Sequence, residues 1–374
     1  MKNKRIIAVH LLNDFSGSPL VLRQSLEILT ATSEVHLYTS TPSGNGILSN
    51  IEGVSQYNIF YRWSPNKFIT LLLFTWSQLV LFSTLLFALK KNDTVYVNTL
   101  LPFGAALAGI CRGCRVIYHI HEVSIKPPLL KSFLVKIAAF CSDEIIFVSE
   151  FVKGQFNFSG EKSRVVYNAL PDSFANEAMK TVCPDKKNPF TVLMLSSLKA
   201  YKGIYKFVEI AGVLPDITFK LVLNASLKDV VLFQKETGAP ENCLIYPAQK
   251  NTSPFYKSAH IVVNLSLTDQ WLETFGMTVL EGMYYGLPVI VPPVGGVTEL
   301  VNDGVDGIYA DSRDVEVVTA AIQHLYSDEA YYRKMALSAW CRAQHFSQSA
   351  FRRKIKSTFN VNEEIFAGAP LLEV

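Results

Sequence analysis

The chain has 374 residues, of which 49% are hydrophobic and 18% are charged, and its formal net charge is +3. This length exceeds what one core usually supports and the composition excludes a disordered chain, so two folded domains are expected. The small positive charge does not indicate nucleic-acid binding, and the Cys111-x-x-Cys114 pair lacks the further ligands of a zinc site. The scattered cysteines and the shortness of the first apolar run predict a reduced, cytoplasmic protein.

Short apolar runs alternate with longer helical segments through the first half of the chain. Such alternation predicts a parallel, doubly wound sheet with helices on both faces. The predicted strands cover residues 6–12, 34–39, 94–99, 115–121, 144–149 and 164–168.

The loop at residues 13–19 joins the first predicted strand to the first helix. Gly17 in this loop would let a ligand approach the backbone, although a plain turn is the alternative interpretation. The Gly44-x-Gly46 pair is not a dinucleotide fingerprint, because Ser49 stands where its third glycine would be.

Residues 68–89 contain no charged side chain and are long enough to cross a bilayer, which needs about 20 apolar residues. Lys67, Lys90 and Lys91 flank both ends, so no orientation across a membrane is favoured. A predicted strand follows at once. We therefore expect one helix of the alternating domain that lies partly covered or against a membrane surface, with a true span as the less favoured alternative.

His121 ends the apolar run at residues 115–121, at the edge of the sheet where ligands bind in doubly wound folds. His119 and His121 point to the same face of the strand, and His121 lies nearer the edge. We predict that His121 faces the substrate. The alternatives are a structural histidine with satisfied hydrogen bonds and, with Glu122, two ligands of a metal site.

Residues 169–189 contain several prolines and show no clear hydrophobic periodicity, so they are predicted to form a linker. A second alternating set of strands is predicted at residues 190–196, 219–223, 244–246, 261–266 and 289–291. The chain is predicted to be helical from about Arg313, and residues 360–374 have only a weak pattern.

Lys202 follows the first strand of this second set and stands just before a helix predicted to begin at Ile204. A lysine at this point can neutralise a phosphate, whereas the alternative is a solvated surface lysine. For Lys199 the solvated surface lysine is the favoured interpretation.

Glu273 and Glu281 bracket a predicted strand-to-helix turn. A helix that begins near Gly276 leaves the amides of Gly276, Met277 and Thr278 unpaired, and these amides suit a diphosphate. Glu281 lies about 7 Å further along the helix, where its carboxylate can accept from both hydroxyls of a ribose. Glu273 precedes the helix and would face a sugar. Two solvated acids are the alternative.

The run from Glu273 to Glu281 resembles the E-x7-E motif of the family 4 retaining glycosyltransferases. The resemblance continues through Gly286-Leu287-Pro288 and Gly295-Gly296-Val297-Thr298-Glu299. It implies a GT-B fold, in which two Rossmann-like, doubly wound domains face a cleft. The implied N-terminal domain covers residues 1–170 and binds the acceptor, and the C-terminal domain covers residues 190–345 and binds the nucleotide sugar. A last helix at about 347–359 would return to the first domain.

The resemblance also assigns roles to single residues. Lys202 matches the diphosphate lysine of a G-R-L-x-x-x-K-G pattern, but Ser196 and Ser197 replace its usual glycine and arginine, so Lys199 or the helix amides would carry more of the phosphate charge. The implied catalytic residues are Glu273, His121 and Lys202. The implied donor-binding residues are Glu281, Gly276, Phe275, Met277, Thr278, Lys202, Ser197 and Gly17.

The predicted activity is transfer of a sugar from a nucleoside diphosphate sugar, with a UDP-sugar favoured, to a hydroxyl of a lipid-linked or growing polysaccharide acceptor. The chain contains no Asp-x-Asp, the usual carboxylate clamp for a metal on the diphosphate, so no metal or other cofactor is expected. We expect a cytoplasmic location at the inner membrane face and no nucleic-acid partner. The alternatives are a sugar-nucleotide epimerase of the same fold and a noncatalytic sugar-nucleotide-binding subunit.

Overall fold

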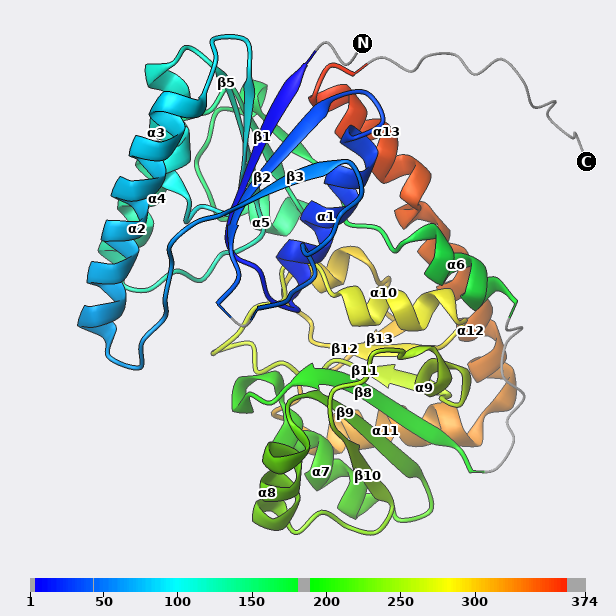
Figure 1. Cartoon of the computed structure of the whole chain (residues 1–374). Helices are drawn as coiled ribbons and strands as arrows, with labels where there is room; N and C mark the ends of the chain where they lie inside the picture. Colours follow the sequence, from blue (N-terminus) through cyan, green and yellow to red (C-terminus); the bar gives the residue numbers. More distant parts are fainter. Residues whose placement is uncertain (1–3, 43, 181–188, 362–374) are drawn as a thin grey trace, which may run out of the picture.

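The computed structural model describes residues 4–42, 44–180 and 189–361. It contains two parallel sheets, each with helices on both faces (Figure 1). This architecture confirms the predicted fold class of two Rossmann-like, doubly wound domains. Parts of the predicted linker and tail, residues 181–188 and 362–374, lie outside the described residues, and the predicted domain limits stay a prediction.

The N-terminal sheet has the order β3-β2-β1-β4-β5-β6-β7. Its strands are β1 (Arg5–Leu12), β2 (Glu34–Ser40), β3 (Val54–Asn58), β4 (Thr94–Asn98), β5 (Arg115–Ile120), β6 (Glu144–Phe147) and β7 (Ser163–Val165). The helices along this part of the chain are α1 (Gly17–Leu29), α2 (Lys67–Ala88), α3 (Phe103–Cys111), α4 (Pro128–Cys141), α5 (Glu150–Gly154) and α6 (Asp172–Met179).

Alternation along β1 divides the N-terminal core into two layers. Ile7 and Val9 belong to the hydrophobic cluster that packs under α2, α3 and α4. Ile6 and Ala8 belong to the cluster under α1 and the last helix. Successive side chains of a strand point to opposite faces, so one apolar run supplies both layers of a sheet buried on both sides.

The C-terminal sheet has the order β10-β9-β8-β11-β12-β13. Its strands are β8 (Thr191–Ser197), β9 (Thr218–Asn224), β10 (Cys243–Tyr246), β11 (Ile261–Val263), β12 (Val289–Val291) and β13 (Gly307–Tyr309). The helices of this part of the chain are α7 (Ile204–Val213), α8 (Leu227–Thr237), α9 (Ser253–Lys257), α10 (Met277–Tyr284), α11 (Val315–Ser327), α12 (Glu329–Ala343) and α13 (Gln348–Thr358).

Helix α13 leaves the C-terminal part of the chain and lies beside α1 (Figure 1). Phe351, Ile355 and Phe359 are buried in the cluster on the α1 side of the N-terminal sheet. The ring of Phe359 meets that of Tyr96 at a centroid distance of 4.9 Å. The end of the described chain is therefore part of the first core.

Several elements differ from the sequence prediction. Strand β3 is largely exposed at the sheet edge and carries polar residues, and β13 has three residues and starts with Gly307, so neither shows an apolar run. Helix α6 occupies part of the predicted linker. Strand β6 ends at Phe147 rather than at Ser149, because Ser149 caps α5 by accepting from the Val152 amide. Strands β7 and β11 are likewise shorter than predicted.

Loops at the carboxyl ends of the two sheets contact each other. The Ser149 hydroxyl donates to the Thr274 carbonyl at 2.7 Å. The carboxylate of Glu299 accepts from the amides of Glu150 and Phe151 at 2.9 and 2.5 Å, so an acidic side chain of one domain caps a helix of the other. These contacts hold the segment that contains Glu273 against the N-terminal domain.

The packing of α13 gives a first testable prediction. Phe351→Ala should lower the free energy of unfolding by about 3 to 5 kcal/mol, because the ring is fully buried and its loss leaves a cavity. Chemical denaturation followed by circular dichroism measures the change. Arg353→Ala on the exposed side of the same helix is the matched control and should change little. Equal stability of the two variants would contradict the packing described here.

Candidate functional site

The predicted site residues gather where each sheet reverses its strand order. In the N-terminal sheet the reversal lies between β1 and β4, and in the C-terminal sheet between β8 and β11. Connections from these neighbouring strands leave in opposite directions, which opens a crevice at their carboxyl ends. The loops after β8 and β11 carry Lys202 and Glu273. Gly17 begins the helix that follows β1, and Asn98 is the last residue of β4.

Lys202 and Glu273 form an ion pair at the carboxyl edge of the C-terminal sheet. The distance between Lys202 Nζ and Glu273 Oε1 is 2.5 Å, and both side chains are largely covered. The same carboxylate oxygen accepts from the Ser266 hydroxyl at 2.9 Å. Lys202 Nζ also lies 4.5 Å from the ring centroid of Trp271, close enough for a cation–π interaction. The structure thus brings the predicted lysine and the first predicted glutamate together.

The environment of Glu273 keeps its carboxylate ionised. Burial alone would raise the pKa of Glu273, but the charge of Lys202 and the hydrogen bonds from Lys202 and Ser266 outweigh burial and hold the pKa below its ordinary value. Because Glu273 stays ionised beside Lys202, it is suited to accept hydrogen bonds from hydroxyl groups rather than to donate a proton.

Gly276 starts α10 in a conformation that other residues rarely adopt. Its φ is +103°, and a Cβ atom would come within 2.9 Å of the Val297 side chain. Among the described residues, the amides of Gly276, Met277 and Thr278 have no hydrogen-bond acceptor. The helix therefore begins with free donors beside the Lys202–Glu273 pair, as an anion site requires.

Glu281 projects from the second turn of α10 into a covered position. Its Oε2 accepts from the Tyr256 hydroxyl at 2.5 Å. Burial raises the pKa of Glu281 to about 7, against the opposing effect of the Tyr256 hydrogen bond. Because few hydrogen-bond donors surround this carboxylate, a ligand that donates hydroxyl hydrogen bonds to it would stabilise its ionised form.

Other residues predicted to bind the donor are placed differently. The Phe275 side chain is buried against Tyr167 and Phe346, so only its backbone is available to a ligand. Ser197 ends β8 and brings no positive charge, and Lys199 is exposed in the loop that follows. Lys202 is therefore the lysine of this loop that lies in the covered part of the site.

His121 is held by a side chain that the sequence prediction did not include. Its Nε2 lies 2.8 Å from Asn98 Oδ1, and Asn98 Nδ2 lies 3.2 Å from the Ser18 carbonyl oxygen. A carbonyl can only accept, so Ser18 fixes which end of the amide is the donor. Asn98 Oδ1 then accepts from His121, which places the histidine proton on Nε2 and leaves Nδ1 as the basic nitrogen of the neutral ring.

Two further histidines surround this arrangement. His10 Nδ1 lies 3.0 Å from Asn98 Nδ2, and the ring of His119 lies 4.3 Å from that of His121. Burial lowers the pKa of His10 to about 4 and of His119 to about 3, and it lowers the pKa of His121 well below its ordinary value. The cluster is neutral at neutral pH, since charging any one member would cost its desolvation.

Glu122 does not form a metal pair with His121. Its carboxylate accepts from the amide of Leu100 at 2.7 Å and from the amide of His121 at 3.2 Å. It joins the ends of β4 and β5 and so fixes the backbone beneath His121. Within the described residues, no group of three or more histidine, cysteine or acidic side chains is arranged to hold a metal ion.

Gly17 is the first residue of α1, and apart from its chain neighbours and the backbone of its own helix, no atom lies within 4 Å of the position that a Cβ would take. Its backbone has no positive φ, so neither conformation nor internal packing requires glycine there. The space beside it is open at the carboxyl end of β1.

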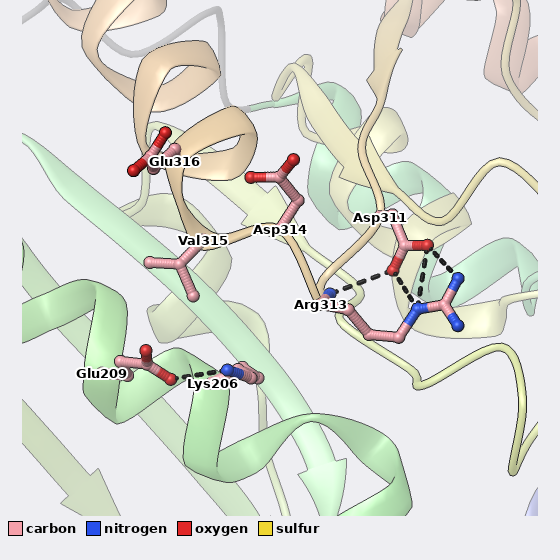
Figure 2. A pocket seen from close by; sticks show the side chains of 7 residues that line it. All are labelled: Lys206, Glu209, Asp311, Arg313, Asp314, Val315 and Glu316. Atoms are coloured by element: carbon pink, nitrogen blue, oxygen red, sulfur yellow. Dashed lines mark hydrogen bonds and ion pairs between the residues drawn. The ribbon is translucent and has the colours of Figure 1, made fainter.

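A hollow on the surface beside α7 lies apart from these residues (Figure 2). Lys206 pairs with Glu209 at 2.8 Å and Arg313 pairs with Asp311 at 2.5 Å, and the further acidic residues Asp314 and Glu316 leave the lining net negative. It contains none of the predicted site residues. We therefore do not include it in the candidate site.

Sequence reasoning missed the residues that support the predicted ones. Ser266 and Trp271 contact the Lys202–Glu273 pair, and Tyr256 contacts Glu281. Asn98 holds His121, and His10 contacts Asn98. Asn98 and His10 lie at or near the carboxyl ends of predicted strands, as His121 does. That position could have identified them as candidate site residues. Tyr256 lies on the five-residue helix α9 and has no such signal.

Comparison with known proteins links the second half of the chain to sugar transfer. Residues 176–339, less than half of the chain, match the family model "Glycosyl transferases group 1". D-inositol 3-phosphate glycosyltransferase of Paenarthrobacter aurescens (strain TC1) is 27% identical over 192 residues, which are 46% of this chain and 43% of that protein. The same enzyme of Frankia alni is 30% identical over 145 residues, or 39% and 32%. The chain thus matches less than half the length of these relatives.

Solved structures resemble the whole fold. Anabaena Alr3699/HepE in complex with UDP and glucose superposes with a TM-score of 0.76 and 18% identity, over 96% of this chain and 100% of that one. WaaG, a glycosyltransferase involved in lipopolysaccharide biosynthesis, gives a TM-score of 0.67 at 14% identity over 94% and 99%. At these identities the likeness shows a shared two-domain fold.

The orientation of His121 by Asn98 can be tested by titration. Asn98→Asp places a carboxylate 2.8 Å from His121 Nε2, so the pKa of His121 should rise by about 1 to 3 units. Nuclear magnetic resonance of the imidazole nitrogens measures this pKa, and in the unaltered protein it reports the proton on Nε2. Asn92→Asp adds the same charge at an exposed position and should leave His121 unchanged. A proton on Nδ1, or no shift with Asn98→Asp, would refute the arrangement.

The buried carboxylate of Glu281 makes stability depend on pH. The pKa of Glu281 is about 7 in the folded protein, above its ordinary value of 4.5. The protonated carboxyl group therefore contributes its full stability to the folded state below pH 4.5, and this contribution is lost as the pH rises through 7. Glu281→Gln, which keeps an acceptor for Tyr256, should therefore stabilise the protein at pH 8 by about 2 to 3 kcal/mol and not at pH 4.5. Urea unfolding at both pH values measures the difference.

Glu236→Gln is the matched control for this substitution, because Glu236 also accepts from a tyrosine hydroxyl, that of Tyr205, but lies exposed. It should change the free energy of unfolding by less than about 0.5 kcal/mol at either pH. If Glu281→Gln destabilises the protein at pH 8, the carboxylate is not buried as described.

Proposed function

We propose that this protein is a retaining glycosyltransferase that moves a sugar from a nucleoside diphosphate sugar to a hydroxyl acceptor. The observation that carries the proposal is the Lys202–Glu273 pair beside the free amides at the start of α10, with Glu281 one and a half turns further on. These groups offer, in order, partners for sugar hydroxyls, a diphosphate and a ribose. The family match over residues 176–339 covers all of them.

The diphosphate binds to the amides of Gly276, Met277 and Thr278 and to Lys202. Charge-assisted hydrogen bonds of this kind are stronger where water is excluded, and they grow stronger as negative charge develops on the leaving group. Lys202 is already fixed between Glu273 and Trp271, so it needs little reorganisation. With Ser197 in place of an arginine, these donors carry more of the phosphate charge.

The acceptor hydroxyl approaches from the N-terminal domain, on the side of His121. The bond between the anomeric carbon and the phosphate oxygen breaks as the acceptor oxygen bonds to that carbon on the same face, and the acceptor proton passes to the departing diphosphate. Glu273 accepts hydrogen bonds from the sugar hydroxyls and remains ionised throughout, in keeping with its low pKa. Neutral His121 donates from Nε2 to Asn98, so Nδ1 is the ring nitrogen that could accept a hydrogen bond from the substrate.

The donor is a UDP-sugar, and no metal is needed because lysine and helix amides supply the positive charge. The structural likeness to Anabaena Alr3699/HepE, solved with UDP-glucose, favours this base. The acceptor is lipid-linked or a growing polysaccharide, which the protein meets in the cytoplasm at a membrane surface. The structural likeness to WaaG, a glycosyltransferase involved in lipopolysaccharide biosynthesis, favours this class of acceptor.

Substitution of Lys202 tests the transferase proposal. Lys202→Ala should lower kcat/KM for sugar transfer from a UDP-sugar by about 100-fold or more, since it removes a donor to the leaving group. Lys206→Ala, one turn into α7 and paired with Glu209 on the surface, is the matched control and should keep full activity. Release of UDP and the configuration of the glycosidic product are measured with an extracted lipid acceptor.

Further experiments distinguish a transferase from the two alternatives, a sugar-nucleotide epimerase and a noncatalytic binding subunit. The first is incubation with the donor alone. An epimerised donor in the absence of an acceptor would establish a sugar-nucleotide epimerase instead. Binding of UDP-sugars in thermal shift assays without turnover on any acceptor would establish a noncatalytic binding subunit. An inverted product would overturn the retaining mechanism while leaving the transfer itself intact.

A further inference from the structure

Helix α2 is the most apolar exposed element of the described chain. By length and composition alone it could cross a membrane, and 28% of its most apolar window is buried. Ser77, Gln78, Leu81 and Leu85 face inward, and Gln78 Oε1 accepts from the amide of Gly104 at the start of α3. The helix is therefore one layer of the N-terminal domain, and only its outer side is open to a partner.

The outer side of α2 presents a continuous row of large apolar side chains. Phe68, Leu72, Trp76 and Leu79 follow one another at helical spacing and are 81%, 71%, 57% and 55% exposed. Exposed apolar patches of this kind mark protein or membrane contacts. Nothing in the fold requires four such residues outside the core.

Helix α4 repeats the pattern on the other side of α3. Leu129, Phe133 and Phe140 are exposed at helical spacing, and Lys136 stands in the same row. Ring contacts from Phe74 through Phe103 to Phe133 join α2, α3 and α4. All three helices pack on the same face of the sheet (Figure 1), so their outer sides form one surface, which we name the α2–α4 face.

Basic side chains outnumber acidic ones around this face, and exposed Asp143 follows the end of α4. Asp93 and Glu122 are the only acidic residues between positions 54 and 142. Asp93 pairs with Arg5, and Glu122 accepts from backbone amides, so neither offers a free negative charge. The exposed basic residues of the same stretch include Arg62, Lys67, Lys90, Lys91, Lys126 and Lys136.

We propose that the α2–α4 face docks on the surface of a bilayer that contains anionic lipids. Apolar side chains would enter the boundary between headgroups and acyl chains, while the surrounding lysines and arginines would contact phosphates. The N-terminal ends of α2 and α4 lie on the carboxyl side of the sheet, the side of His121, and exposed Trp63 and Leu129 stand there. Docking would bring a lipid-linked hydroxyl next to the candidate site.

The docking inference stands apart from the transferase proposal, because vesicle binding needs no substrate. The test is sedimentation of the full chain with vesicles of phosphatidylcholine alone or of equal parts phosphatidylcholine and phosphatidylglycerol. The protein should sediment with the anionic vesicles and much less with the neutral ones, and added salt should release it. The triple variant Leu72→Ser, Trp76→Ser, Leu79→Ser should bind on the order of 100-fold more weakly.

Two further variants make the test specific. The triple variant Leu227→Ser, Leu232→Ser, Leu337→Ser removes similarly exposed residues from the C-terminal part of the chain and should bind as the unaltered protein does. Each of Lys67→Glu, Lys90→Glu and Lys136→Glu should weaken binding to anionic vesicles by about fivefold or more. Circular dichroism confirms that each variant is folded.

Each of the following outcomes would overturn the inference. The protein would remain in solution with anionic vesicles, or the α2 variant would sediment as well as the unaltered chain, or both vesicle types would bind equally. Sedimentation without vesicles that is abolished by the α2 variant would identify a second copy of the chain as the occupant and would also refute bilayer docking. Loss of sugar transfer with docking retained would refute only the function proposed above.

Discussion

The site depends on one topological constraint, the reversal of strand order between β1 and β4 and between β8 and β11. In a parallel sheet every loop that follows a strand emerges at the same edge, and only at a reversal do two adjacent loops diverge and leave room for a ligand. Lys202, Glu273 and Gly17 follow strands that flank a reversal, and Asn98 ends one. Residues as far apart in sequence as Ser18 and Asn98 thereby meet, and contacts through Ser149 and Glu299 bring the two edges together.

Much of this arrangement could be predicted from the sequence. Buried parallel strands are continuous apolar runs, so β1, β4, β5, β8 and β12 were recognisable, and with them the two-domain fold. The turn from Glu273 to Glu281 was recognisable because glycine, acidic residues and a flanking strand occur at fixed spacing. Edge strands β3 and β13 were missed because burial on both faces is what produces an apolar run, and neither has it.

The partners of the site residues were beyond the sequence for a different reason. Asn98 and His121 are 23 positions apart, Tyr256 and Glu281 are 25 apart, and Lys202 and Glu273 are 71 apart. Their meeting depends on strand order and on side-chain rotamers, which leave no local pattern. Burial raises the pKa of Glu281, whereas the contacts with Lys202 and Ser266 lower the pKa of Glu273. Two glutamates of one motif thus acquire opposite acid–base properties that the motif itself does not encode.

The ion pair between Lys202 and Glu273 has a consequence for selectivity. Because each charge already has a partner, a small anion that engages Lys202 leaves Glu273 buried without compensation, and the loss offsets what the anion gains. A ligand that carries both a phosphate for the lysine and hydroxyl groups for the carboxylate replaces both halves of the pair at once. On the function proposed above, the resting site would therefore bind a molecule in which phosphate and sugar are joined in preference to inorganic phosphate.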